Sequence, residues 1–191
     1  MAEPALEHLL TGDEFFDLGD IGPCELIDGR IVPMPPTGGE HGTIEGNIAF
    51  ILQELVRPRA LGWVLTGEVG IYTRRNPDRI RAADVAFVAK NQVDEIPSGF
   101  LEFPPELVVE IVSPNDRWQD IRQKIDEYFA TGIRTLWIVE PRTRSILVHS
   151  SPMEAIKYNE AQNLICNGTL DGLAVPVSEV FRDVAIRDLS L

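Results

Sequence analysis

The sequence predicts an α/β domain whose central sheet mixes parallel and antiparallel strands and is flanked by helices. Two apolar runs, 107–112 and 135–139, enclose an amphipathic segment over 117–131, an order typical of a parallel strand-helix-strand crossover. A hairpin pattern over 24–34 and a long apolar run over 80–90 precede this unit and favour antiparallel neighbours. The 191 residues suffice for one domain with a large core, so we expect a single domain over 1–191.

The first elements are a short helix and a hairpin. Thr11 followed three residues later by Glu14 has the spacing of a capping box, which predicts a helix that ends near Gly19. In the hairpin, Asp28-Gly29 is the expected two-residue turn. This turn places Glu25 opposite Val32 in the neighbouring strand.

A longer helix is predicted over 41–56, because isoleucines and leucines recur there at helical spacing. Two short strands, 63–66 and 68–73, should follow and join at Gly67. The strand over 80–90 comes next, and then a polar loop over 91–105 that is rich in proline and glycine. The helix over 117–131 should end at Gly132, a favourable residue for a left-handed C-terminal cap.

The C-terminal part carries weaker signals. A strand over 145–149 is expected to follow the turn 141–144. Beyond it, residues 151–191 alternate only weakly, which predicts edge strands, a loop over 167–172 and a tail.

Charge and composition limit the range of functions. The net charge is −13, from 30 acidic and 17 basic residues, which argues against broad attraction to DNA phosphates or anionic membranes. A local basic rim or a bound divalent cation would offset this field. Cys24 and Cys166 are too few for a disulfide framework and lack metal-ligand spacing. Because neither a signal peptide nor a membrane span is indicated, the cytoplasm is the expected compartment.

Three charged residues stand out as candidates for chemistry. Glu110 interrupts an apolar strand, where an ionised carboxylate is costly without a cation or strong donors. Asp84 lies where the apolar part of another strand begins, and Lys124 projects from the helix that follows Glu110. Two carboxylates on adjacent strands can hold a hard cation such as Mg²⁺, and a nearby lysine can hold a phosphate oxygen or help to deprotonate water.

Each candidate also has an ordinary structural interpretation. Lys124 lies at the edge of the buried helical stripe, and one turn of helix also separates it from Asp120, an alternative partner. Asp84 as a strand-start residue could bond nearby backbone. For Glu110 the alternative is a buried ion pair with Arg81 or Arg134.

The remaining polar candidates carry weaker signals. His41 opens the long helix, where Glu45 is its nearest expected partner. Glu25 lies in a half-exposed hairpin, and Glu68 after Gly67 has the context of a turn carboxylate. The motifs of P-loop nucleotide enzymes, serine hydrolases and zinc proteases do not occur.

Several short runs occur in a characteristic order over roughly residues 11 to 150. They are Glu25-Leu26-Ile27-Asp28-Gly29, His41, Ala83-Asp84-Val85-Ala86-Phe87-Val88, Pro105-Glu106-Leu107-Val108-Val109-Glu110-Ile111-Val112-Ser113-Pro114, Lys124, Tyr128, Gly132 and Trp137-Ile138-Val139-Glu140-Pro141. Together they resemble the bacterial Uma-type family of restriction-endonuclease-like proteins, within the PD-(D/E)XK nuclease superfamily. The ordered set is specific, whereas each short run alone is not.

The resemblance implies a restriction-endonuclease-like fold and a nuclease that uses Mg²⁺ or Mn²⁺. Asp84 matches the motif aspartate and Glu110 the acidic residue of the second half-motif, so both are implied metal ligands. Where the superfamily motif has a lysine two residues after the glutamate, this chain has Val112. Lys124 would then supply that lysine from the next helix, a migration known in the superfamily. Glu25 and His41 match positions typical of the family and would line the cleft.

The implied substrate is nucleic acid, with DNA expected, and the resemblance allows a homodimer, since many such nucleases pair to cut two strands. Membrane association is not expected. Two other functions stay open. One is a binding or assembly module without catalysis, favoured by the charge of −13 and by Val112. The other is a phosphodiesterase acting on small molecules.

Overall fold

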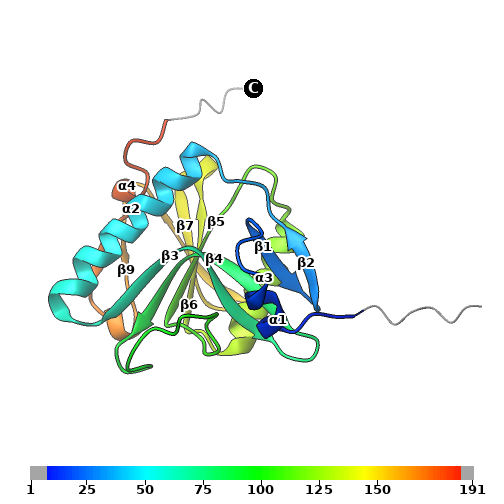
Figure 1. Cartoon of the computed structure of the whole chain (residues 1–191). Coiled ribbons are helices and arrows are strands. Elements are labelled where there is room, and N and C mark those ends of the chain that lie inside the picture. Colours follow the sequence, from blue (N-terminus) through cyan, green and yellow to red (C-terminus); the bar gives the residue numbers. More distant parts are fainter. Residues whose placement is uncertain (1–7, 186–191) are drawn as a thin grey trace, which may run out of the picture.

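The structure, a computed structural model, describes residues 8–185, and in that span eight strands form one mixed sheet. The strand order is β2-β1-β4-β5-β6-β7-β8, with β3 paired to β4 as well (Figure 1). Only the β5–β6 pair is parallel among these pairs. The bounds are β1 Cys24–Ile27, β2 Arg30–Pro33, β3 Gly62–Arg74, β4 Arg79–Ala89, β5 Leu107–Ile111, β6 Thr135–Glu140, β7 Ser145–Ser151 and β8 Glu154–Asn159. The predicted fold class, a mixed sheet flanked by helices, is confirmed.

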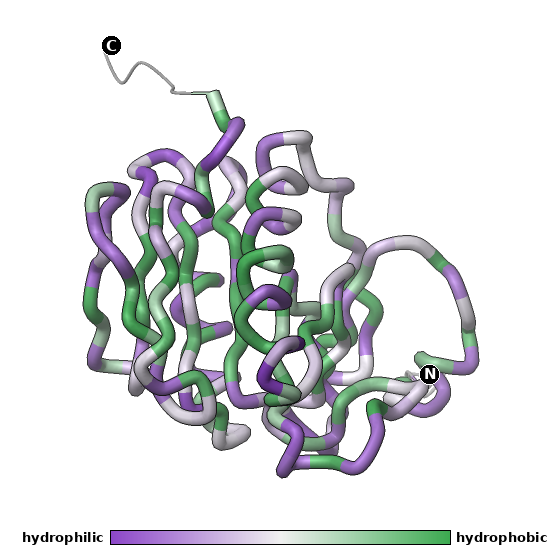
Figure 2. Tube along the Cα trace, turned by 90° about the vertical axis from the view of Figure 1, so that its left-hand side faces the viewer, coloured by the Kyte–Doolittle hydropathy of each residue, from purple (hydrophilic) through white to green (hydrophobic). Residues whose placement is uncertain are grey.

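Helices cover both faces of this sheet. The main ones are α1 (Gly12–Asp17), α2 (Gly39–Val56) and α3 (Trp118–Thr131). α2 crosses the front face in Figure 1, and α3 lies behind the sheet. Each helix buries its apolar stripe against one side of the strands: Ile44, Ile48 and Leu52 pack with Val85 and Val109, whereas Ile121, Ile125 and Tyr128 pack with Val108 and Ile138. Seen from the side, hydrophobic residues concentrate along the strands and hydrophilic ones in the outer turns (Figure 2).

The N-terminal predictions are confirmed in detail. Thr11 and Glu14 form both hydrogen bonds of the capping box at the start of α1. Glu25 pairs with Val32, as the two-residue turn requires. The turn residues Asp28 and Gly29 both have positive φ, +55° and +76°, the geometry that Asp-Gly hairpin turns favour.

The prediction of two short strands joined at Gly67 is wrong, because β3 is one strand of 13 residues. It pairs with β4 along its length, and a register shift between Thr66 and Val69 marks a bulge. Gly67 and Glu68 form this bulge with φ of +84° and +62°. Two residues of β3 therefore face one residue of β4, Asp84. Gly67 marks a bulge within one strand and not the end of a strand.

The C-terminal segment is partly as predicted. β8 is the expected edge strand beside β7. The next strands, β9 (Asn163–Ile165) and β10 (Ala174–Pro176), pair with each other instead of extending the main sheet. With the short helix α4 (Val177–Val180) they pack on the face of the sheet that α2 covers. Residues 186–191, part of the predicted tail, lie outside the described residues.

The loop over 91–105, predicted as a polar surface loop, buries part of its apolar side chains. Leu101 is buried and hydrogen-bonds through its backbone to β3. Phe100 packs against the aromatic rings of α1. Among the described residues, no helix is long and apolar enough to span a membrane.

Candidate active site

The candidate site lies where the sheet opens along one edge of β4. β3 runs along the whole of β4, so β1 and β5 must share the opposite edge. β1 pairs with β4 at Ile80, and β5 pairs from Val85 onward. Residues 81–84 lie between these two partners, and the sheet's own hydrogen bonding is interrupted there.

Two carboxylates accept backbone N–H groups where the pairing between strands is interrupted. Glu25 Oε1 accepts a hydrogen bond from the backbone N–H of Ala82 at 3.2 Å. Asp84 Oδ2 accepts one from the backbone N–H of Ile111 at 2.6 Å. Both carboxylates are buried, so these bonds satisfy groups that would otherwise be costly. Asp84 does bond backbone, but across the sheet and not within its own strand.

His41 approaches Asp84 from the first turn of α2. Its Nε2 lies 3.3 Å from Asp84 Oδ1, and both side chains are buried. Burial lowers the pKa of His41, but the hydrogen bond and charge of Asp84, with the charges of Glu45 and Glu68, outweigh it and raise the pKa overall. The expected pairing with Glu45 is wrong, because Glu45 accepts from the N–H of Gly67 at 3.1 Å.

Glu110 is held by two donors from one helix. Its Oε2 accepts from Lys124 Nζ at 2.8 Å, and its Oε1 accepts from the hydroxyl of Tyr128 at 2.6 Å. Lys124 and Tyr128 lie one turn apart on α3, so one face of the helix donates hydrogen bonds to both carboxylate oxygens of Glu110. Burial, together with the charge of Asp84, raises the pKa of Glu110 to about 7, although Lys124 and Tyr128 oppose the shift.

Lys124 forms ion pairs with two acidic side chains at this place. Besides Glu110, its Nζ lies 3.5 Å from Glu25 Oε1. Burial lowers the pKa of Lys124, but the charges of Glu110 and Glu25, followed by that of Asp84, outweigh this effect and raise the pKa above its usual value. Lys124 is therefore a fixed ammonium group. It faces these carboxylates and not Asp120.

The arginines proposed as alternative partners of Glu110 are engaged elsewhere. Arg81 donates to Glu25 at 2.6 Å and to Glu127 at 2.6 Å. Arg134 lies 3.7 Å from Glu106. Among the described residues, Lys124 is thus the cationic side chain within ion-pair distance of Glu110.

The donor atoms at this place suit a hard cation. In the part of the chain that the structure describes, no three His, Cys, Asp or Glu side chains gather closely enough to enclose a metal. Mg²⁺, however, is commonly bound by one or two carboxylates, with water and phosphate oxygens as the other ligands. Asp84 and Glu110 provide two carboxylates from neighbouring strands. A small hollow of about 50 Å³ lies beside Glu110 and Lys124.

Comparison with known proteins identifies the family. The family model Uma2, described as "Putative restriction endonuclease", matches residues 13–182. The chain belongs to the Uma2 family. The resemblance inferred from the sequence is thereby confirmed.

A solved structure similar to this Uma2 chain is described as a "putative nuclease belonging to DUF820" from Anabaena variabilis. The two share 20% sequence identity and a TM-score of 0.75, over 90% of this chain and 97% of the other. This likeness confirms the fold of the Uma2 chain. The search of curated proteins found no match.

The structure brings together all five residues that the sequence singled out in this Uma2 chain, and it adds three. Lys124 contacts both Glu25 and Glu110. Asp84 accepts the N–H of Ile111, the residue next to Glu110, and His41 contacts Asp84. The residues missed as members of the site are Tyr128, Arg81 and Glu68. The spacing of four residues between Lys124 and Tyr128 was a usable signal for Tyr128. The sequence contains no comparable signal for Arg81 and Glu68, because their roles depend on contacts across the sheet.

Proposed function

We propose that this Uma2 protein is a divalent-metal-dependent nuclease that hydrolyses phosphodiester bonds of nucleic acid, with DNA as the expected substrate. The observation that carries the proposal is the position of Lys124 Nζ, 2.8 Å from Glu110 Oε2. The strand lacks a lysine at Val112, and α3 supplies the cation instead. The family description supports the same activity.

Asp84 and Glu110 are the proposed ligands of Mg²⁺ or Mn²⁺. An ion held by these two residues would supply positive charge opposite the negative charge on the reacting phosphate and would favour deprotonation of water. The hydrogen bond from the N–H of Ile111 holds Asp84 in place. The paired donors Lys124 and Tyr128 fix the plane of the Glu110 carboxylate.

Lys124 is proposed to donate hydrogen bonds to a phosphate oxygen and to the attacking water. Because its pKa is raised, it acts as a donor and a positive charge and not as a base. Glu25 and His41 contact Lys124 and Asp84, respectively, so we assign them positioning roles at the edge of the site.

The proposal predicts that Asp84→Asn and Glu110→Gln slow cleavage by roughly a hundredfold or more, the scale seen when one charge-stabilising group is lost from an active site. The assay measures cleavage of plasmid and of single-stranded DNA with Mg²⁺ or Mn²⁺. Glu154→Gln on the exposed strand β8 is the matched control and should cleave like the parent protein. Equal cleavage by all three variants would contradict the assignment of Asp84 and Glu110 as metal ligands.

Metal binding should strengthen as the pH rises through about 7. Burial raises the pKa of Glu110 to about 7, so at lower pH a proton occupies the carboxylate and competes with the metal. Calorimetric titration with Mn²⁺ between about pH 6 and pH 8 should show rising affinity and release of a proton on binding. An affinity independent of pH, with no proton released, is the contrary result.

One observation favours a second candidate, a binding module without catalysis. Both oxygens of Glu110 already accept hydrogen bonds, so Lys124 and Tyr128 satisfy the buried carboxylate with protein groups alone. This candidate predicts no thermal shift with Mg²⁺ or Mn²⁺. A calorimetric divalent-cation site that Glu110→Gln abolishes would exclude it.

A further inference from the structure

A hollow of about 460 Å³ lies between α1 and the strands β3 and β4. Its volume is within the range typical of sites for small organic groups. Its lining combines aromatic and aliphatic side chains with two carboxylates. The lining residues that matter here are Phe16, Asp20, Ile21, Glu68, Ala82 and Phe100.

The hollow lies close to the candidate active site along β3 and β4. Ala82 lines the hollow, and its backbone N–H donates to Glu25. Asp84 follows two residues later on β4, about 7 Å along an extended strand. Glu68 also lines the hollow and belongs to the bulge of β3 that faces Asp84. A molecule in the hollow would therefore sit beside the proposed metal ligands.

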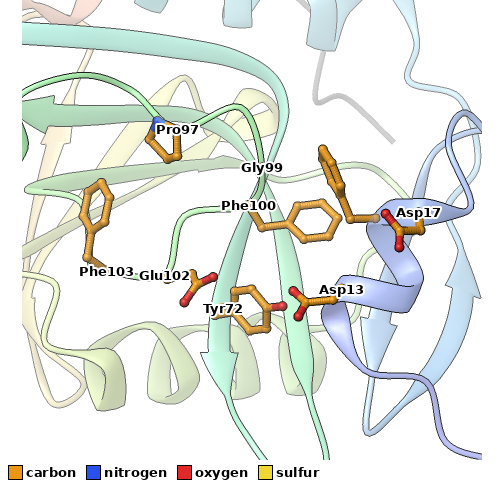
Figure 3. Close-up of a pocket in the computed structure, with 9 residues that line it drawn as sticks. Asp13, Asp17, Tyr72, Pro97, Gly99, Phe100, Glu102 and Phe103 are labelled. Carbon is orange, nitrogen blue, oxygen red and sulfur yellow. The ribbon is translucent and has the colours of Figure 1, made fainter.

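Aromatic rings form one wall of the hollow. Phe100 packs directly over Gly70 of β3, where a Cβ atom would collide with the ring. Phe16 meets Phe100 edge to face, with 5.4 Å between ring centroids, and remains 47% exposed. Figure 3 shows the neighbouring hollow, of about 420 Å³, which shares these two rings; Phe100 points there toward α1. The ring pair thus stands between two open spaces.

The charged side chains that line the two hollows disfavour a phosphate group as the occupant, although Arg75 stacks on Tyr72 and pairs with Glu102 at the edge of the neighbouring hollow. None of the described residues that line either hollow is a lysine or an arginine. The charged side chains in the linings are all carboxylates: Asp13, Asp17, Asp20, Glu68 and Glu102. Carboxylates accept hydrogen bonds from amino groups, and aromatic faces stack with flat neutral rings. A nucleobase with an exocyclic amino group combines both features.

We propose that the hollow beside Glu68 binds an unpaired nucleobase, so that the substrate of this protein is single-stranded or locally unpaired nucleic acid. The inference rests on the proposed nuclease function, because the nucleobase belongs to the strand whose phosphate reaches Asp84 and Glu110. A base inside a duplex is stacked and paired and does not enter such a hollow unless it is flipped out. Adenine and cytosine fit better than thymine, which lacks the amino group.

The test measures binding and not cleavage. A fluorescent single-stranded oligodeoxyadenylate is titrated with the full chain without divalent metal, and anisotropy reports binding. Phe16→Ala should weaken binding about tenfold, the scale of one lost base–aromatic stack. Phe50→Ala is the matched control, because Phe50 is 66% exposed on α2 and does not line the hollow. Duplex DNA of the same sequence should compete poorly, and oligothymidylate should bind less tightly.

Three results would overturn the inference: equal binding by the Phe16 and Phe50 variants, competition by duplex as strong as by single strands, or Phe16-dependent binding of an oligoarginine peptide in place of the oligonucleotide. The last result would assign the hollow to a basic protein partner. Failure of the nuclease proposal is distinguishable, because Asp84→Asn should lose cleavage and keep Phe16-dependent binding. If the parent protein binds in this way but never cleaves, the hollow assignment stands and the nuclease proposal does not.

Discussion

Lys124→Met is expected to lower the rate of metal-dependent DNA cleavage by about a thousandfold. Two effects combine. The variant loses the ammonium group proposed to contact the phosphate, and it also loses a charge that lowers the pKa of Glu110. Without that charge, burial keeps Glu110 protonated at neutral pH, and the metal ligand is lost as well. The measurements are the cleavage rate and the Mn²⁺ affinity as functions of pH.

Lys157→Met is the matched control for this prediction. Lys157 also pairs with a glutamate, Glu140, at 2.8 Å, but it lies half-exposed on the edge strand β8. Its loss should leave cleavage and metal affinity unchanged. Raising the pH should restore metal binding to the Lys124 variant, because it removes the proton from Glu110. Full cleavage by Lys124→Met at neutral pH would refute the role assigned to the helix lysine.

Arg81→Met should destabilise the fold by about 3 kcal/mol or more, the cost of removing one partner from a buried ion pair. Arg81 is buried and bridges the carboxylates of Glu25 and Glu127. Burial lowers its pKa, but the hydrogen bonds and charges of Glu127 and Glu25 outweigh this effect and raise it. After the substitution, the partners left to Glu25 among the described residues are the N–H of Ala82 and the more distant Lys124. Urea unfolding of both proteins measures the difference in the free energy of unfolding.

The control for Arg81 is Arg74→Met. Arg74 pairs with Asp28, but both side chains are about two-fifths exposed. After the substitution Asp28 keeps its second partner, Arg79, and water. Its effect should stay within about 1 kcal/mol. Equal destabilisation by both variants would show that burial of the Arg81 network contributes nothing beyond a surface ion pair.

The part of the site on β5 and α3 was predictable because its signals are local. The apolar run around Glu110 indicates a buried strand, and helical spacing places Lys124 at the edge of the buried stripe. The strand-helix-strand order then returns the helix to the sheet beside the same strand. These regularities span few residues, so the sequence indicates an approach of Lys124 to Glu110, with Asp120 as the alternative partner that spacing alone leaves open.

The other half of the site depends on pairing between distant segments. His41 meets Asp84 and Glu25 meets Arg81 only because α2 and β1 pack where they do. No periodicity in the sequence indicates that β1 and β5 share one edge of β4. The bulge at Gly67 is likewise not specified by the sequence, since a glycine between apolar runs indicates a strand end as readily as an extra residue.

The opening along β4 ties the chemistry of this protein to its framework. Glu25 and Asp84 act as substitutes for strand backbone, because they accept the N–H groups of Ala82 and Ile111. The hairpin of β1 and the sheet from β5 onward are thus joined, at this seam, through acidic side chains and not through a continuous ladder. A ligand that draws Asp84 away from Ile111 also breaks the hydrogen bond that joins β4 to β5 at this place. Binding at the site and rigidity of the sheet therefore depend on the same carboxylate.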